Sequence, residues 1–231
     1  EDVLSALLCS AQAAAVRSTL LGLLPARPCA PTEPLDEQLH REACYSALGI
    51  GAWSLQETLS YSQLLDAIVA EAGAIAGAPS LPLAAPLQAR LCWLVSCWWA
   101  FGGGDGGDAD EAACSASYGL LAQMLLHGAD VAVRLQAALT LHTLLLNAVD
   151  DDLRVFAPVA PQVCVGLAAS LAACETDEAT LWVLRVLGKL LRQLPGLWQQ
   201  REAQEALPPV LTRLWERALA EGRELIAREL R

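Results

Sequence analysis

Pairs of helical patterns recur along this chain at a nearly constant interval. Arg41, Arg90 and Arg134 lead the second helix of three successive pairs, 49 and 44 residues apart, and small and apolar residues follow each of them. In the fourth pair, Asp177 takes the place of Asp130 after 47 residues. Such a period is produced by tandem structural units that bury their apolar faces against their neighbours. It constrains the fold more than any single motif does.

The length of the interval predicts the class of repeat. Periods of about 40–47 residues are typical of HEAT and armadillo arrays, whereas tetratricopeptide and ankyrin repeats are about 34 and 33 residues long. We therefore expect an all-α protein, an α-solenoid of tandem HEAT-type helical hairpins in a right-handed superhelix. The expected repeats cover approximately residues 1–53, 54–101, 110–149, 155–194 and a truncated 206–231, within a single solenoid segment, residues 1–231.

Composition supports a helical chain with much buried surface. Apolar residues make up 55% and charged residues 18%, below the usual charged share of about 25%. Ser54 with Glu57, and Ser60 with Gln63, have the spacing of capping boxes, which mark helix starts. The expected helices cover residues 3–24, 35–53, 61–76, 86–101, 111–127, 130–149, 160–174 and 177–194, followed by a last pair from residue 206 that ends in a helix over 221–231.

The clearest local repeat motif lies in the segment DVAVRLQAALTL, residues 130–141. Asp130 is expected at the helix start, where its carboxylate meets free amides and the positive end of the helix dipole. Val133 and Leu141 are expected to fill the layer between helices, and Ala137 to let the paired helix approach closely. Arg134 is predicted to form an ion pair at a repeat junction with Asp130 or Asp177.

Tryptophans on the helix led by Arg90 have two predicted roles. Trp93 and Trp98 share one helix face and are expected in the core. Trp99 points to a different face, so we expect it to be exposed and available to a partner, because aromatic side chains dominate binding hot spots.

The chain is strongly acidic, with a formal net charge of −11 and Lys189 as its only lysine. Such a charge disfavours direct nucleic-acid binding and favours basic protein partners. The run Asp150, Asp151 and Asp152 is expected to end a helix and to join two repeats. It serves either the solubility of the loop, the favoured interpretation, or contact with a partner.

No cofactor, metal or catalytic site is predicted. The cysteines have no metal or redox spacing, and those inside apolar helical runs (Cys44, Cys92, Cys97 and Cys164) are expected to be free buried thiols of a reducing compartment. The histidines His40, His127 and His142 are scattered. The glycine- and aspartate-rich loop 102–110 is interpreted as a flexible linker, with calcium binding as the weaker alternative. No catalytic motif is present, so we expect no enzyme activity.

Membrane insertion is not expected, although residues 155–174 carry no charge. Their length would permit a crossing, but Pro158, Pro161 and Gln162 lie near their start. The chain begins at Glu1 without methionine and ends within a predicted helix, so we expect it to be a piece of a longer protein.

Four segments together resemble the central region of the karyopherin-β (importin-β) family, and among its branches most closely the importin-eleven-like one. They are REACYSALG (41–49), RLCWLVSCWW (90–99), DVAVRLQAALTL (130–141) and NAVDDDLRVFAP (147–158). The resemblance covers about residues 37–194 and implies a nuclear transport receptor that shuttles between nucleus and cytoplasm. Members of that family bind protein cargo on the concave solenoid surface, contact nucleoporin Phe-Gly repeats, and release import cargo when the small GTPase Ran binds with GTP.

The resemblance implies that Ran contacts lie largely in N-terminal repeats outside this segment, so no Ran-binding residue is assigned. Two alternatives remain open from the residues alone. One is a non-transport HEAT-repeat scaffold or adaptor for protein complexes, and the other is an α-helical enzyme or membrane domain.

Overall fold

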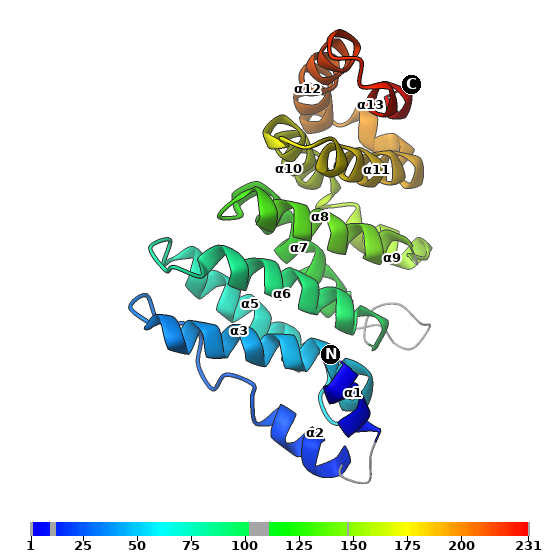
Figure 1. Ribbon diagram of the computed structural model, residues 1–231. Coiled ribbons are helices and arrows are strands. Elements are labelled where there is room, and N and C mark those ends of the chain that lie inside the picture. Colours follow the sequence, from blue (N-terminus) through cyan, green and yellow to red (C-terminus); the bar gives the residue numbers. More distant parts are fainter. Residues whose placement is uncertain (1, 10–12, 102–110, 147, 231) are drawn as a thin grey trace. The chain divides into compact units, whose positions relative to one another are not determined.

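The chain is all-helical in its computed structural model, which describes residues 2–9, 13–101, 111–146 and 148–230 (Figure 1). Every regular element in these ranges is a helix, and no strand occurs in them. The prediction of an all-α class is therefore confirmed. The helices group into two compact units, Glu1–Ser117 and Tyr118–Arg231, and the boundary falls within helix α7 (Glu111–His127).

The first unit is built from three long helices and several shorter ones. Its elements are α1 (Asp2–Leu8), α2 (Ala13–Leu21), α3 (Leu35–Ile50), α4 (Ala52–Leu55), α5 (Tyr61–Ala76), α6 (Ala84–Trp98) and the 3₁₀ helix η1 (Trp99–Phe101). Helices α5 and α6 form a hairpin, and α3 lies beside α6. The unit therefore has α3 and α6 in one layer and α5 behind them.

Close approach of α3 and α6 depends on a glycine. A Cβ atom at Gly49 would lie 2.3 Å from the Trp93 ring, so only glycine leaves room for that indole. One turn further along α6, Trp98 is fully buried and its Nε1 donates a hydrogen bond of 3.2 Å to the carbonyl of Leu48. Burial of an indole with its N–H bonded to a carbonyl stabilises the contact between the two helices.

The second unit has a similar arrangement. Its elements after α7 are α8 (Val131–Leu146), α9 (Asp150–Phe156), α10 (Ala160–Ala173), α11 (Asp177–Gln193), η2 (Pro195–Gln199), α12 (Arg201–Ala220) and α13 (Glu224–Glu229). Helices α10 and α11 form a hairpin; α8 lies beside α11, and α12 lies beside α10 (Figure 1). Here too a glycine permits a close contact, since a Cβ at Gly166 would lie 2.6 Å from the Cβ of Leu125.

Several predicted helix boundaries are confirmed and others are wrong. Helices over 61–76 and 111–127 have the predicted limits. Ser60 and Gln63 form the predicted capping box, with the Ser60 hydroxyl accepting from the Gln63 amide at 3.3 Å. Ser54 caps nothing, because it lies within α4.

Corrections concentrate at the two ends of the chain. The described part of the predicted first helix, 3–24, forms two helices, α1 and α2. The last pair begins at Arg201 rather than near residue 206, and α12 continues through Pro208 and Pro209. A proline lacks the amide that the helix interior uses, which is why the sequence predicted a later start. The terminal helix α13 begins at Glu224, after Gly222 adopts a positive φ of 66°.

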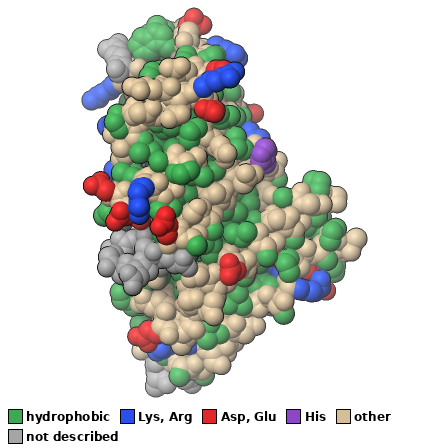
Figure 2. Space-filling model, turned by 180° about the vertical axis from the view of Figure 1, so that it is seen from behind, with side chains coloured by type: hydrophobic (Ala, Val, Ile, Leu, Met, Phe, Trp, Pro, Cys, Tyr) green, Lys and Arg blue, Asp and Glu red, His purple; other side chains and the backbone are tan. Residues whose placement is uncertain are grey.

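Apolar side chains are widespread on the face of the molecule that Figure 2 shows, and charged groups form small separate clusters there. Within the described residues, no single helix combines the length and apolar character that a membrane crossing requires. Helices α9 and α10 have the required length and apolar character only when they are taken together, and they are bent by 75° relative to each other.

Candidate functional site

Trp99 is buried, contrary to the prediction that it is exposed for a partner. Only 4% of its surface is accessible, and its ring meets the Tyr61 ring edge-on at a centroid distance of 6.3 Å. The α-helix ends at Trp98 and Trp99 begins a 3₁₀ turn. The 3.6-residue period therefore does not extend to Trp99, and that period had placed it on an outer face.

The acidic run begins a helix and does not end one. Asp150, Asp151 and Asp152 form the first turn of α9, where carboxylates interact favourably with the helix dipole. Asp152 is buried, and its Oδ2 accepts a hydrogen bond of 3.1 Å from the amide of Val149. Asp150 and Asp151 are exposed. The Asp152 carboxylate is thus bound to the backbone at the start of its own helix. Partner contact through Asp150 and Asp151 stays a prediction.

The predicted repeat motif has the expected local geometry. Oδ1 of Asp130 accepts a hydrogen bond of 3.0 Å from the amide of Val133, so the carboxylate caps the start of α8 as predicted. Val133, Ala137 and Leu141 are completely buried. These four residues fix where α8 begins and which face it buries.

Arg134 does not form the predicted ion pair. Its Nε is buried without a hydrogen-bond partner in the described part of the chain. The carboxylate of Asp130 is used in the cap, and that of Asp177 pairs with Arg223 at 2.8 Å. The three repeat-leading arginines therefore differ in their surroundings, although they occupy similar places in the sequence.

Arg90 does link neighbouring helices. Its guanidinium, on α6, pairs with Glu42 of α3 at 2.6 Å and lies 4.7 Å from the centroid of the Trp93 ring. The cation is thus shared between a carboxylate and an aromatic face, an arrangement typical of arginine. Trp93 is half-buried, and Trp98 is in the core as predicted.

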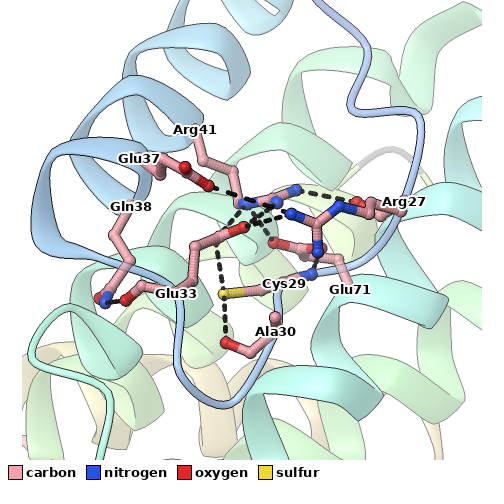
Figure 3. Close-up of polar contacts among 8 residues, drawn as sticks. All are labelled: Arg27, Cys29, Ala30, Glu33, Glu37, Gln38, Arg41 and Glu71. Carbon is pink, nitrogen blue, oxygen red and sulfur yellow. Dashed lines mark hydrogen bonds and ion pairs between the residues drawn. The ribbon is translucent and has the colours of Figure 1, made fainter.

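The most elaborate polar site lies where the loop before α3 crosses the first unit (Figure 3). Arg41 of α3 donates two hydrogen bonds to the Glu33 carboxylate, from Nη2 at 2.6 Å and from Nε at 2.9 Å. The Cys29 thiol donates to the same carboxylate at 2.9 Å. Arg41 also donates to the backbone carbonyl of Arg27 at 3.1 Å. These bonds fix the loop to the first turns of α3.

A second carboxylate joins the cluster from α5. Oε2 of Glu71 accepts a hydrogen bond of 2.8 Å from the amide of Cys29, and its Oε1 lies 3.4 Å from Nε of Arg41. Gln38 extends the network, since its side chain donates to the carbonyl of Glu33 at 2.7 Å and accepts from the amide of Leu83 at 3.0 Å. Two loops and two helices are therefore connected by buried polar groups.

Burial and charge set the ionisation of this cluster. The Arg41 guanidinium holds the pKa of Glu33 below its ordinary value. Burial raises the pKa of Glu71, which the Arg41 charge only partly opposes. The pKa of the Cys29 thiol is raised to about 12, first by burial and then by its bond to Glu33. The thiol is consequently protonated at neutral pH and is no nucleophile there.

A hollow of about 430 Å³ lies beside the cluster, lined by the loop and by residues of α3 that include Glu37, His40 and Cys44. Two of the charged groups that line it, Glu33 and Arg41, are already engaged with each other in a bidentate ion pair. The arrangement is suited to holding the loop in place.

No pattern in the sequence predicts this cluster. Glu33 and Arg41 are eight residues apart across a helix start, so neither helical nor strand periodicity connects them. Glu71 lies 42 residues from Cys29. The available signal was the presence of charged residues at positions that the apolar pattern of α3 and α5 assigns to buried faces.

None of the eight cysteines is paired in a disulfide. Cys44, Cys92 and Cys164 are buried as predicted, and Cys97 is partly exposed. In the ranges that the structure describes, no group of three or more histidine, cysteine or acidic side chains is arranged to hold a metal ion. The loop 102–110, considered above for calcium, lies outside the described residues.

Comparisons with known proteins add no assignment: no family model, no curated protein and no solved structure matches this chain.

Proposed function

We propose that this chain is a protein-binding segment of a HEAT-type α-solenoid. One observation carries the proposal: within each unit, helices of 14 to 20 residues pack side by side in two layers, as α3, α6 and α5 do in the first unit and α8, α11, α10 and α12 in the second. Hairpins stacked in this way leave one exposed helix row per layer. Proteins built so bind partners along these rows.

The specific form that we propose is a nuclear transport receptor of the importin-β type, which carries protein cargo, contacts Phe-Gly repeats and responds to Ran. Its support is the resemblance of the four segments, which covers about residues 37–194. The acidic surface supports a basic cargo, because opposite charge accelerates encounter. Small rotations between successive hairpins would add up to changes in curvature, and a ligand would select the curvature that it binds best.

The test uses the longer protein that the resemblance implies, because Ran contacts are expected outside this segment. Proteins retained by the immobilised receptor are identified by mass spectrometry, and one of them is purified as the cargo. Its affinity is then measured with Ran–GTP, with Ran–GDP and without Ran. We expect Ran–GTP to weaken cargo binding by at least tenfold, an effect of about 1.4 kcal/mol, and Ran–GDP to have no effect.

An affinity that is the same in all three conditions would contradict the transport proposal. It would favour the alternative of a HEAT-repeat scaffold or adaptor, which binds its partner irrespective of nucleotide state.

A further inference from the structure

Helix α11 carries a row of positive side chains on one face. Arg185, Lys189 and Arg192 follow one another at intervals of four and three residues, the spacing that brings side chains together on a helix. Arg185 and Arg192 are exposed, and Lys189 is half-buried. The Arg192 side chain lies back along the helix, since a Cβ at Gly188 would be 3.9 Å from its Nη2. We refer to these three cations as the basic ridge.

The basic ridge has no carboxylate partner among the described residues, although the chain has 26 acidic residues and a net charge of −11. Arginines elsewhere do form ion pairs, namely Arg27, Arg41, Arg90, Arg154, Arg201, Arg217 and Arg223. Among the same described residues Arg134 also lacks an ion pair, so the distinguishing feature of the basic ridge is that its three cations adjoin one another on one helix face.

Aromatic surface borders the basic ridge. Trp182, one turn before Arg185 on α11, keeps 37% of its surface exposed. The Arg185 guanidinium lies 5.5 Å from the centroid of its ring, and His142 of the adjacent helix α8 meets the ring edge-on at 6.1 Å. The pKa of His142 is lowered, mainly by burial and further by the charges of Lys189 and Arg185. His142 is therefore neutral at pH 7, and the field around it is positive.

Helix stability does not account for the basic ridge. A cation in the last turn interacts favourably with the helix dipole, which explains Arg192 only. Arg185 and Lys189 lie earlier, and like charges three or four residues apart destabilise a helix. Glu178, exposed at the start of the same helix, forms no ion pair with the ridge. A partner that supplies negative charge would remove this repulsion.

We propose that the basic ridge and Trp182 bind an acidic protein segment. Aspartate or glutamate side chains of the partner pair with Arg185, Lys189 and Arg192, and an apolar residue packs on the Trp182 ring. Charge complementarity between the three cations and the carboxylates of such a segment selects this occupant, and the exposed Trp182 ring offers an apolar contact beside them. The inference rests on the proposed function only in that the chain binds proteins. The partner proposed here is acidic, whereas the proposed cargo is basic.

The test is a fluorescence anisotropy titration of this chain with a labelled peptide of about twelve residues, rich in aspartate and glutamate around one leucine, at low ionic strength. A triple variant, Arg185→Gln, Lys189→Gln and Arg192→Gln, should bind the peptide roughly tenfold more weakly or worse, and added salt should weaken binding to the wild type. Trp182→Ala alone should weaken binding severalfold.

A matched control removes the same charge elsewhere. The variant Arg154→Gln, Arg201→Gln and Arg217→Gln replaces three exposed arginines on α9 and α12 and should bind the peptide within about twofold of wild type. Circular dichroism verifies the helical content of each variant. If the triple ridge variant does not fold, the single variants Arg185→Gln and Arg192→Gln replace it, each with an expected loss of roughly threefold.

Three results would overturn the proposal: no peptide binding by the wild type, equal binding by wild type and ridge variant, or an equal loss in the control. Tight binding of a single-stranded RNA of similar length that the ridge variant abolishes would assign the surface to nucleic acid instead. Because this assay contains neither Ran nor cargo, its failure leaves the transport proposal intact, and cargo binding that is insensitive to Ran leaves the basic ridge intact.

Discussion

Glu33 and Glu71 share one buried guanidinium but are held in different ionisation environments. Glu33 makes two short hydrogen bonds with Arg41, and its pKa is lowered. Glu71 receives a backbone amide and a longer contact to the same cation, and burial raises its pKa. Removing one member of a buried ion pair leaves an uncompensated charge, which is more costly than the pair was favourable. The two carboxylates should therefore respond differently to the same substitution.

Glu33→Gln should lower the free energy of unfolding at pH 7 by about 3 kcal/mol, because Arg41 loses its closest counter-charge. Glu71→Gln should change it by no more than about 1 kcal/mol, since a neutral amide keeps the acceptor for Cys29 and avoids the cost of a buried charge. Urea denaturation of both variants and the wild type measures the difference. A larger loss in Glu71→Gln than in Glu33→Gln would show that the charge balance is wrongly assigned.

The pH dependence of stability follows from the same shifts. A carboxyl whose folded pKa is lowered stabilises the fold above its ordinary pKa, and this contribution is lost as the pH falls through the lowered value. Glu71 has the opposite sign: its contribution is present below its ordinary pKa and is lost as the pH rises through the raised value. Hence the free energy of unfolding of Glu33→Gln should fall less than that of the wild type as the pH is lowered from 5 to strongly acidic values. The free energy of unfolding of Glu71→Gln should change less with pH than that of the wild type above pH 4.5.

Helices in each unit approach one another through glycines whose position can be tested. A Cβ at Gly49 of α3 would collide with the Trp93 ring of α6 at 2.3 Å. Gly73 of α5 is exposed, and a Cβ there would meet no atom within 4 Å. Both residues are inside α-helices, so the two sites differ in packing and share the same backbone preference.

Gly49→Ala should lower the free energy of unfolding by about 1–3 kcal/mol, because overpacking forces the indole or α6 to move. Gly73→Ala should raise it by about 0.5–1 kcal/mol through the lower entropy of the unfolded chain. Thermal melts followed by circular dichroism compare the two. Equal shifts of the same sign would contradict the close packing of α3 on α6.

Sequence information was sufficient for elements whose limits are set locally. The helix Tyr61–Ala76 was predicted to its ends, because the Ser60–Gln63 cap and an apolar stripe define it without reference to other elements. The burial of Val133, Ala137 and Leu141 followed from periodicity in the same way. Trp99 was misplaced because the helix tightens into a 3₁₀ turn, a change that depends on tertiary packing. The cluster around Arg41 joins residues from two helices and two loops, and no local pattern specifies such a meeting.

At the scale of the whole molecule, the proposed solenoid and its binding function depend on how successive hairpins follow one another. Each unit separately has two layers of helices, with α3 beside α6 and α8 beside α11. Continuation of the same stacking along the chain would give an open array with exposed rows. Closure around one core would bury the same faces and leave no extended surface for cargo or for an acidic partner.

Small-angle X-ray scattering of the chain in dilute solution distinguishes these arrangements most directly. A globule of 231 residues would have a radius of gyration of about 17 Å. The proposed solenoid predicts a clearly larger radius of gyration, with a pair-distance distribution that is skewed toward long distances. A monomer with a radius of gyration near that of the globule and a symmetric distribution would contradict the solenoid, and the proposed mode of protein binding would have to be abandoned with it.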